Sequence, residues 1–222
     1  MLTYQDLINI KVKETNEMLV SVSKNCSDII LLPPKDMIQY SGNDIYLRES
    51  VVNLLKLALN ELHQVDGRYN LLLSYGYRHP EIQKAYFQKE KAIIFKNNPN
   101  LSEKSLIEAT HKLIAVPAIA GHPSGGAVDL TLTFREKPID MGTQIAEFLK
   151  GDMIQTFSDL ISPTQRSNRL LLRKIMMNAG FAPFDGEWWH FSFGDREWAC
   201  YYNQSHAIYD CVENTASYML YR

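Results

Sequence analysis

The stretch GHPSGGAVDLTLT, residues 121–133, decides the fold because it joins a glycine turn to an alternating strand. Its apolar positions alternate with Asp129 and two threonines, and side chains two residues apart lie on the same face of a strand. The two adjacent glycines give the backbone the freedom to reverse. The stretch therefore predicts a strand with Asp129 on its polar face and a turn that returns His122 to the same point. The apolar face would consist of Val128, Leu130 and Leu132.

A second stretch, WWHFSF at residues 188–193, has the same period and predicts another strand. His190 would lie opposite an apolar row made of Trp189, Phe191 and Phe193. If the two strands are neighbours in one sheet, His190 and Asp129 converge and His122 completes the cluster. Each residue alone is more often an ordinary hydrogen-bonded group. Together, two imidazoles and a carboxylate are a common ligand set for catalytic zinc, which keeps a fourth position for water.

Glu187 is the candidate general base beside this cluster. It precedes His190 by an odd number of residues, so the two side chains would lie on opposite faces of a regular strand. We therefore expect Glu187 in the turn that enters the strand. From there its carboxylate can reach a water molecule on the metal.

Helical and strand patterns alternate in the rest of the chain. Apolar residues recur at helical spacing over residues 48–63, and YNLLLSYGYR at residues 69–78 predicts a strand. HPEIQKAYFQKEKAII, residues 79–94, predicts a helix with Pro80 in its first turn. The combination is typical of the α+β class, with a small mixed or antiparallel sheet and flanking helices. Because no linker or repeat interrupts the chain, we expect one domain over residues 1–222.

A third helix is bounded by clear signals. Ser162 can cap it, Pro163 suits its first position, and Gly180 suits the left-handed residue that ends a helix. Its buried face would consist of Leu171, Leu172, Ile175, Met176 and Ala179.

Composition excludes several classes of function. The 222 residues carry 23 Lys and Arg, dispersed along the chain, against 25 Asp and Glu, so neither a nucleic-acid nor a membrane partner is expected. The charged first twenty residues do not resemble a signal peptide, which predicts a cytoplasmic protein. The three cysteines lack CxxC spacing and indicate free thiols. His63, His111 and His206 have no motif around them and are interpreted as surface or packing residues.

Two motifs together resemble a known family. HPSGGAVD at residues 122–129 resembles the HxxGxAxD motif of the zinc D,D-peptidases (family M15), and EWWH at residues 187–190 resembles their ExWH motif. GYR at residues 76–78, DLTL after the first motif, MG at residues 141–142 and GF before EWWHF are similar to landmarks of the VanX-type D-alanyl-D-alanine dipeptidases. The resemblance extends over most of the chain, from about Leu71 to Trp198.

The resemblance implies one zinc ion per chain, held by His122, Asp129 and His190. It also implies that Glu187 is the general base and then the general acid, and that Arg78 stabilises the oxyanion. The implied reaction is hydrolysis of the dipeptide D-Ala-D-Ala by a metal-activated water. These roles agree with the chemistry of zinc, carboxylate and guanidinium groups.

The sequence departs from the family pattern around the substrate. Ala120 replaces a usual serine, Tyr75 replaces a usual acidic residue, and His79 separates Arg78 from the following proline. The aspartate expected to meet the ammonium group of the substrate aligns with Ala146, and Glu147 lies beside it. Two alternatives therefore stay open: a D,D-carboxypeptidase that trims peptidoglycan stem peptides, and a zinc-stabilised binding module without catalysis. Oligomeric state is not set by the sequence.

Overall fold

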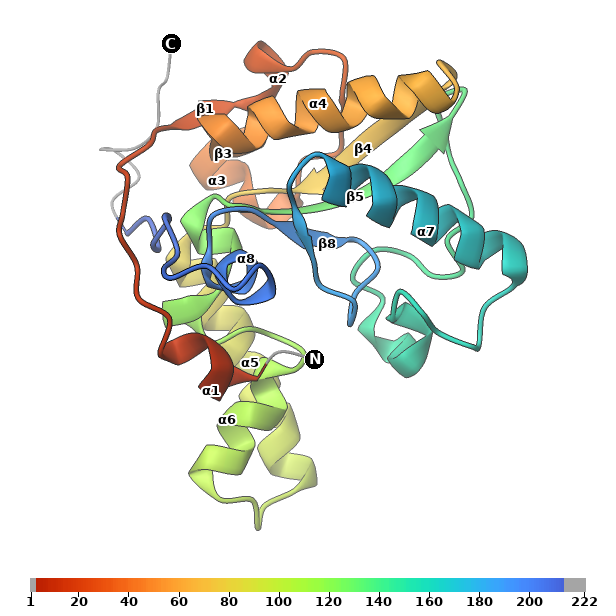
Figure 1. Ribbon diagram of the computed structural model, residues 1–222. Helices are drawn as coiled ribbons and strands as arrows, with labels where there is room; N and C mark the ends of the chain where they lie inside the picture. Colours follow the sequence, from red (N-terminus) through yellow and green to blue (C-terminus); the bar gives the residue numbers. More distant parts are fainter. Residues whose placement is uncertain (1–2, 214–222) are drawn as a thin grey trace.

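One mixed sheet forms the centre of the computed structural model, which describes residues 3–213 (Figure 1). The sheet has the strand order β2-β4-β5-β8-β7, and β6 pairs with β5. Only β2 and β4 are parallel; the other pairs of this sheet are antiparallel. A separate two-stranded sheet joins β1 and β3. The strands are β1 Leu19–Ser21, β2 Ile30–Leu31, β3 Tyr46–Arg48, β4 Tyr69–Tyr75, β5 Ala127–Phe134, β6 Lys137–Pro138, β7 Ala182–Pro183 and β8 His190–Ser192.

Helices flank the sheet, and this confirms the α+β class and the mixed sheet expected from the sequence (Figure 1). The α-helices are α1 Tyr4–Ile8, α2 Val22–Asn25, α3 Ile38–Ser41, α4 Glu49–Val65, α5 Pro80–Asn97, α6 Glu103–His111, α7 Pro163–Asn178 and α8 Arg196–Tyr201. Within residues 3–213, the 3₁₀ segments are η1 Lys35–Met37, η2 Pro117–Ile119, η3 His122–Ser124 and η4 Phe148–Ile154.

The main core lies between the sheet and the pair α4 and α7. These helices contact each other, and they contact β4 and β5 respectively. The apolar alternation of β5 points into this core, as predicted. Fully buried members of this core from α4, β4, β5 and α7 are Leu55, Leu62, Leu71, Leu73, Val128, Leu130, Leu132, Leu172 and Ile175. The opposite face of β5 is left for polar groups, and the functional site is built there.

The caps confirm the predicted boundaries of α7 and the predicted start of α5, whereas α5 runs to Asn97, beyond the expected residue 94. Ser162 Oγ accepts the backbone N–H of Gln165 at 3.2 Å, Pro163 is the first residue of α7, and Gly180 has φ +107°. Leu172, Ile175, Met176 and Ala179 are buried as expected, whereas Leu171 is only half-buried. Helix α5 begins at Pro80, and the unexpected His79 caps it by accepting the N–H of Glu81 at 3.3 Å.

Strand β8 is shorter than the sequence predicts, and this is a correction. Trp188 and Trp189 lie in the turn before the strand, and both are buried, so the alternation does not reach them. The cause is the backbone of Trp188, which donates to the carbonyl of Ile154 at 3.0 Å instead of pairing along the sheet. The indole Nε1 of Trp188 also donates to Thr143 Oγ1 at 2.8 Å.

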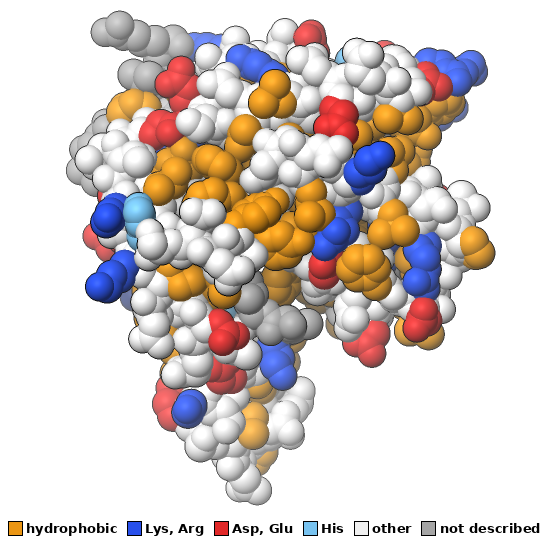
Figure 2. Space-filling view, in the orientation of Figure 1, with side chains coloured by type: hydrophobic (Ala, Val, Ile, Leu, Met, Phe, Trp, Pro, Cys, Tyr) orange, Lys and Arg blue, Asp and Glu red, His pale blue; other side chains and the backbone are white. Residues whose placement is uncertain are grey.

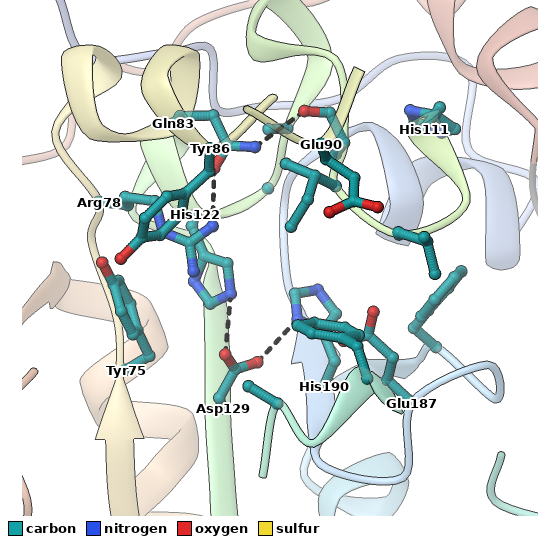
Figure 3. A pocket seen from close by; sticks show the side chains of 18 of the residues that line it. Tyr75, Arg78, Gln83, Tyr86, Glu90, His111, His122, Asp129, Glu187 and His190 are labelled. Carbon is teal, nitrogen blue, oxygen red and sulfur yellow. Dashed lines mark hydrogen bonds and ion pairs between the residues drawn. The ribbon is translucent and has the colours of Figure 1, made fainter. Parts of the chain in front are cut away.

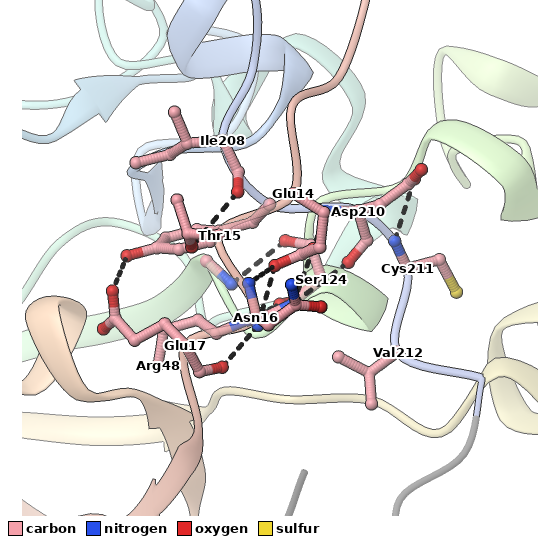
Figure 4. Close-up of polar contacts among 12 residues, drawn as sticks. Glu14, Thr15, Asn16, Glu17, Arg48, Ser124, Ile208, Asp210, Cys211 and Val212 are labelled. Atoms are coloured by element: carbon pink, nitrogen blue, oxygen red, sulfur yellow. Dashed lines mark hydrogen bonds and ion pairs between the residues drawn. The ribbon is translucent and has the colours of Figure 1, made fainter. Parts of the chain in front are cut away.

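The two ends of the described chain meet at one buried side chain (Figure 4). Arg48 is fully buried, pairs with Glu14 at 3.1 Å, and donates to the carbonyl oxygens of Ser124 at 2.7 Å and Asp210 at 3.3 Å. It also donates to the carbonyl of Glu17. We call these five residues the Arg48 tie. It fixes the loop after His122 against segments from both ends of the described chain.

Charged side chains of both signs are interspersed on the face shown in Figure 2. Within residues 3–213, no helix combines the length and the apolar character that crossing a bilayer requires. Cys26, Cys200 and Cys211 are free thiols, as expected.

Candidate metal centre and active site

His122 is aimed by the turn that the glycines allow. It opens η3, and Gly125 ends that turn in the left-handed region with φ +76°. The imidazole Nδ1 lies 2.8 Å from the carbonyl oxygen of Gly76, so Nε2 is the nitrogen left for the pocket. Gly76 itself packs tightly against β3 and the residue before it, because a Cβ there would lie 2.6 Å from Ile45 Cγ2 and 2.9 Å from the carbonyl oxygen of Tyr46. The turn therefore returns His122 to the strand as predicted.

Asp129 and His190 are direct partners across the antiparallel pair β5 and β8. Their side chains share the face of the sheet opposite the core, and His190 Nδ1 lies 2.9 Å from Asp129 Oδ1. On the other side of the carboxylate, His122 Nε2 lies 3.2 Å from Asp129 Oδ2. Figure 3 shows the two imidazoles converging on the carboxylate between them. The predicted juxtaposition of the three residues is therefore present.

The electrostatics of this cluster follow from burial and close pairing. Burial alone would raise the pKa of Asp129, but the charges and hydrogen bonds of His122 and His190 hold that pKa well below its usual range. Burial lowers the pKa of His122, against the pull of Asp129. Burial opposes the charged form of His190 too, yet hydrogen bonds that its imidazole donates to Asp129 and Glu197 raise its pKa well above the usual value. The carboxylate is thus held in the ionised form that a metal ligand needs.

The donor set fits a divalent cation such as zinc. Ligand atoms of His122, Asp129 and His190 all lie within 4.8 Å of one another, and all three residues are buried. Two imidazole nitrogens and one carboxylate oxygen form the protein part of a catalytic zinc site, which leaves a further position for water or substrate.

Glu187 lies in the turn that enters β8, as the odd spacing from His190 predicts. Its N–H donates to the carbonyl of Phe184 at 2.9 Å, and its own carbonyl accepts the N–H of His190 at 3.1 Å. The carboxylate lines the pocket beside the three residues of the cluster (Figure 3). Burial raises the pKa of Glu187 to about 8. A group that titrates near neutral pH is suited to proton transfer.

Glu197 supports His190 from behind, and the sequence analysis did not identify it. Its Oε2 lies 3.5 Å from Nε2 of His190, the ring nitrogen that faces away from Asp129. The Glu197 side chain is 13% exposed, and Glu197 is the second residue of the short helix α8, which follows the cap Asp195. A carboxylate on the far nitrogen orients a metal-binding imidazole and raises its basicity. No periodicity links a strand residue to a residue in the next helix, so the sequence gives no signal for this contact.

Arg78 lies at the pocket wall after β4 has ended. Strand β4 stops at Tyr75, three residues before the end of the strand predicted over residues 69–78, so Arg78 lies in the segment that follows it. Its backbone N–H donates to the carbonyl of His122 at 3.1 Å, and its Nη1 donates to Gln83 Oε1 at 2.8 Å. The backbone of Arg78 is therefore tied to the turn that carries His122, and its guanidinium is tied to α5.

The whole pocket has a volume of about 370 Å³, and the lining residues outside the cluster show where substrate recognition can occur. Ala120 and Ala146 line it, whereas Glu147 does not. Glu147 instead accepts the N–H of Gln144 at 2.9 Å. The acidic side chain that does face the pocket from α5 is Glu90, which makes no hydrogen bond or ion pair with residues 3–213 (Figure 3).

His111 was interpreted from the sequence as a surface or packing residue. It is buried, packs edge-on against the ring of Tyr4, and also lines the pocket. Its Nδ1 accepts the N–H of Val116 at 3.2 Å. The packing interpretation is compatible with these contacts, but it did not predict a place at the pocket wall.

Comparison with known proteins identifies relatives over most of the chain. The family model described as "D-ala-D-ala dipeptidase", of peptidase family M15, matches residues 36–211. A D-alanyl-D-alanine dipeptidase of Synechocystis sp. is 30% identical over 192 residues, which are 75% of this chain and 77% of that protein. A protein of the same name from Enterococcus faecalis is 29% identical over 163 residues, covering 70% of this chain and 77% of the relative.

Solved structures with a similar arrangement are more distant. The protein VanYB in complex with D-alanine-D-alanine is 20% identical, with a TM-score of 0.43, over 74% of this chain and 81% of that one. An LD-carboxypeptidase, LdcB, is 17% identical, with a TM-score of 0.43, over 79% of this chain and 70% of that one.

Proposed function

The chain belongs to peptidase family M15, in the group described as D-Ala-D-Ala dipeptidases, and from this premise we propose that its pocket hydrolyses the peptide bond of D-Ala-D-Ala. The observation that carries the proposal is the convergence of His122 and His190 on Asp129, with Glu187 in the adjoining turn. Peptidases of this family depend on zinc. His122, Asp129 and His190 would hold one zinc ion per chain.

A bound zinc ion supplies a Lewis acid and lowers the pKa of water to about 7. In the proposed mechanism, Glu187 takes a proton from the attacking water and returns it to the leaving amine. Arg78 donates to the oxygen on which negative charge develops. The Gly76 carbonyl holds the orientation of His122, and the two imidazoles hold that of Asp129. Little reorganisation of these side chains is therefore needed during the reaction.

Recognition of a free dipeptide needs a partner for its ammonium group, since an unpaired buried charge is costly. Glu147, which stands beside the expected position in the sequence, is engaged outside the pocket lining. We propose that Glu90 meets the ammonium group, because its carboxylate lines the pocket and has no partner of its own among residues 3–213. We also propose a cytoplasmic location. There the protein would meet the free dipeptide and would have no access to the cell wall.

The test of this function compares kcat/KM for D-Ala-D-Ala and N-acetyl-D-Ala-D-Ala in the zinc-loaded protein. We expect the free dipeptide to be preferred and Glu90→Gln to reduce that preference by about one to two decades, as for the loss of a charge-assisted pair. Glu147→Gln is the matched control and should leave the preference unchanged.

Other outcomes of the same experiment identify the alternatives. Equal or faster cleavage of the blocked dipeptide and of longer stem peptides would indicate a D,D-carboxypeptidase. Zinc binding without hydrolysis of either substrate would indicate a binding module. In both cases the dipeptidase proposal would be wrong. Removing zinc with a chelator should abolish hydrolysis, and adding zinc back should restore it.

A further inference from the structure

A bulge in β4 places an aromatic ring on the functional face of the sheet. Leu73 pairs with Leu130 and Tyr75 pairs with Asp129, so two steps along β4 match one step along β5. Without the bulge, Tyr75 would share the core face with Leu73, because residues two apart point the same way. Bulges re-aim side chains in this manner. The Tyr75 ring accordingly packs edge-on against His122, with ring centroids 5.2 Å apart.

A carboxylate outside the metal cluster holds this tyrosine and a second one. Tyr75 donates its hydroxyl to Oδ2 of Asp36 at 2.8 Å, and Tyr86 donates its hydroxyl to the same oxygen. The three residues come from β4, from α5 and from η1. Burial raises the pKa of Tyr75 above its usual range and that of Tyr86 to about 12, so both phenols keep the proton that they donate.

The two aromatic rings enclose Arg78. Its Cζ lies 4.3 Å from the ring centroid of Tyr75 and 5.4 Å from that of Tyr86, within cation–π distance of both. Nη1 is held by Gln83, whose Nε2 in turn donates to the carbonyl of Ala115 at 2.8 Å. The guanidinium is thus in contact with two rings and hydrogen-bonded at one nitrogen.

We propose that Asp36, Tyr75 and Tyr86, here named the Asp36 cluster, are positioning residues that fix the Arg78 guanidinium at the pocket wall before substrate binds. An arginine side chain has much rotamer freedom, which must be lost when it meets a developing negative charge. The Asp36 cluster removes that freedom in advance, so the donors of Arg78 are already oriented. The inference rests on the role of Arg78 in the proposed function.

The decisive variants remove hydroxyls and keep rings. In Tyr75→Phe and Tyr86→Phe we expect kcat on D-Ala-D-Ala to fall about 10- to 100-fold, with a smaller change in KM, because a misplaced group costs transition-state stabilisation. Zinc content should stay at the wild-type level. In an Arg78→Ala background the same substitutions should have almost no further effect, since the residue that they position is absent.

A second readout does not depend on hydrolysis. The ¹⁵Nε signal of Arg78, assigned by comparison with Arg78→Ala, should report greater side-chain mobility in Tyr75→Phe and in Asp36→Ala. Tyr40→Phe is the matched control, because Tyr40 donates to Glu81 at 2.9 Å and links α3 to α5 without contacting Arg78. It should change neither the signal nor kcat.

The outcomes separate this proposal from the dipeptidase function. Unchanged Arg78 mobility in both variants, or full additivity with Arg78→Ala, would overturn the positioning role. A wild-type protein that fails to hydrolyse D-Ala-D-Ala while the Arg78 signal still responds to Tyr75→Phe would overturn the function and leave the Asp36 cluster as described.

Discussion

Glu187 is the residue at which the proposed chemistry can be tested most directly. Its carboxylate lines the pocket but does not belong to the three-ligand cluster. Glu187→Ala should therefore keep its zinc and its fold while kcat falls by a factor of about 10² to 10⁴, the usual scale for a general acid–base group. Elemental analysis and steady-state kinetics on the same sample check this. Loss of zinc from the variant would show that Glu187 holds the metal.

Glu197 should influence the metal without touching it. Its Oε2 is 3.5 Å from His190 Nε2, and loss of such a carboxylate costs about 10- to 100-fold in metal affinity. We expect Glu197→Gln to release zinc more readily to a competing chelator, with Glu197→Asp intermediate. Glu103→Gln, a change in an exposed carboxylate paired with Lys91, is the control. An unchanged dissociation constant for zinc in Glu197→Gln would contradict this role.

Residues close in sequence to a strong pattern were identified from the sequence alone, and residues joined only by the fold were not. His122, Asp129, Glu187 and His190 stand in or beside two alternating stretches, so the period of a strand brings them together. Asp36 is contributed by a separate 3₁₀ segment, and no spacing relates it to the rest of the site. It becomes visible only when tertiary packing is known.

Among the elements, both strands β5 and β8 could be predicted, but their pairing was only the condition on which the convergence of His190 and Asp129 depended, and the length of β8 was not predicted. The sequence WWHFSF fits a strand, but it fits equally well a short strand preceded by a turn in which both tryptophans are buried. The competing hydrogen bond from Trp188 to Ile154 ends the strand early. The bulge in β4 was also missed, because an inserted residue leaves no mark in a short apolar run.

The cap of α7 allows a stability prediction at this scale. Ser162 Oγ accepts the N–H of Gln165, and the Gln165 side chain accepts the N–H of Ser162 at 2.8 Å. Ser162→Ala should lower the free energy of unfolding by about 1 kcal/mol, as for other N-caps. Ser167→Ala, on the exposed side of the same helix, should not lower it. Urea titrations of both variants measure this difference. Equal midpoints for Ser162→Ala and Ser167→Ala would show that the cap does not contribute to stability.

At the scale of the whole molecule, we propose that the chain unfolds as one domain, because the Arg48 tie joins segments from both ends of residues 3–213 to the loop of the site. The expected domain over 1–222 also includes residues 1–2 and 214–222, which lie outside the described residues. A single cooperative transition, observed equally by far-UV circular dichroism and tryptophan fluorescence, would support one domain.

Arg48→Met tests the tie itself. It removes the charged partner of the Glu14 carboxylate and a donor to several carbonyl groups, so the free energy of unfolding should fall by about 3 kcal/mol. Arg68→Met, which removes an exposed pair with Asp66, should cost less than about 1 kcal/mol. Equal losses in the two variants would contradict the importance of burial at Arg48.

The Arg48 tie also sets an order of events while the chain is being synthesised. All three proposed ligands have emerged from the ribosome once His190 is outside, yet the carbonyl of Asp210 that helps to hold Arg48 arrives later. Until then, the Ser124 loop beside His122 lacks part of its support. We therefore expect arrested nascent chains that expose His190 outside the ribosome, but not yet Asp210, to capture zinc only loosely. Tight metal retention should begin when the Asp210 segment becomes available.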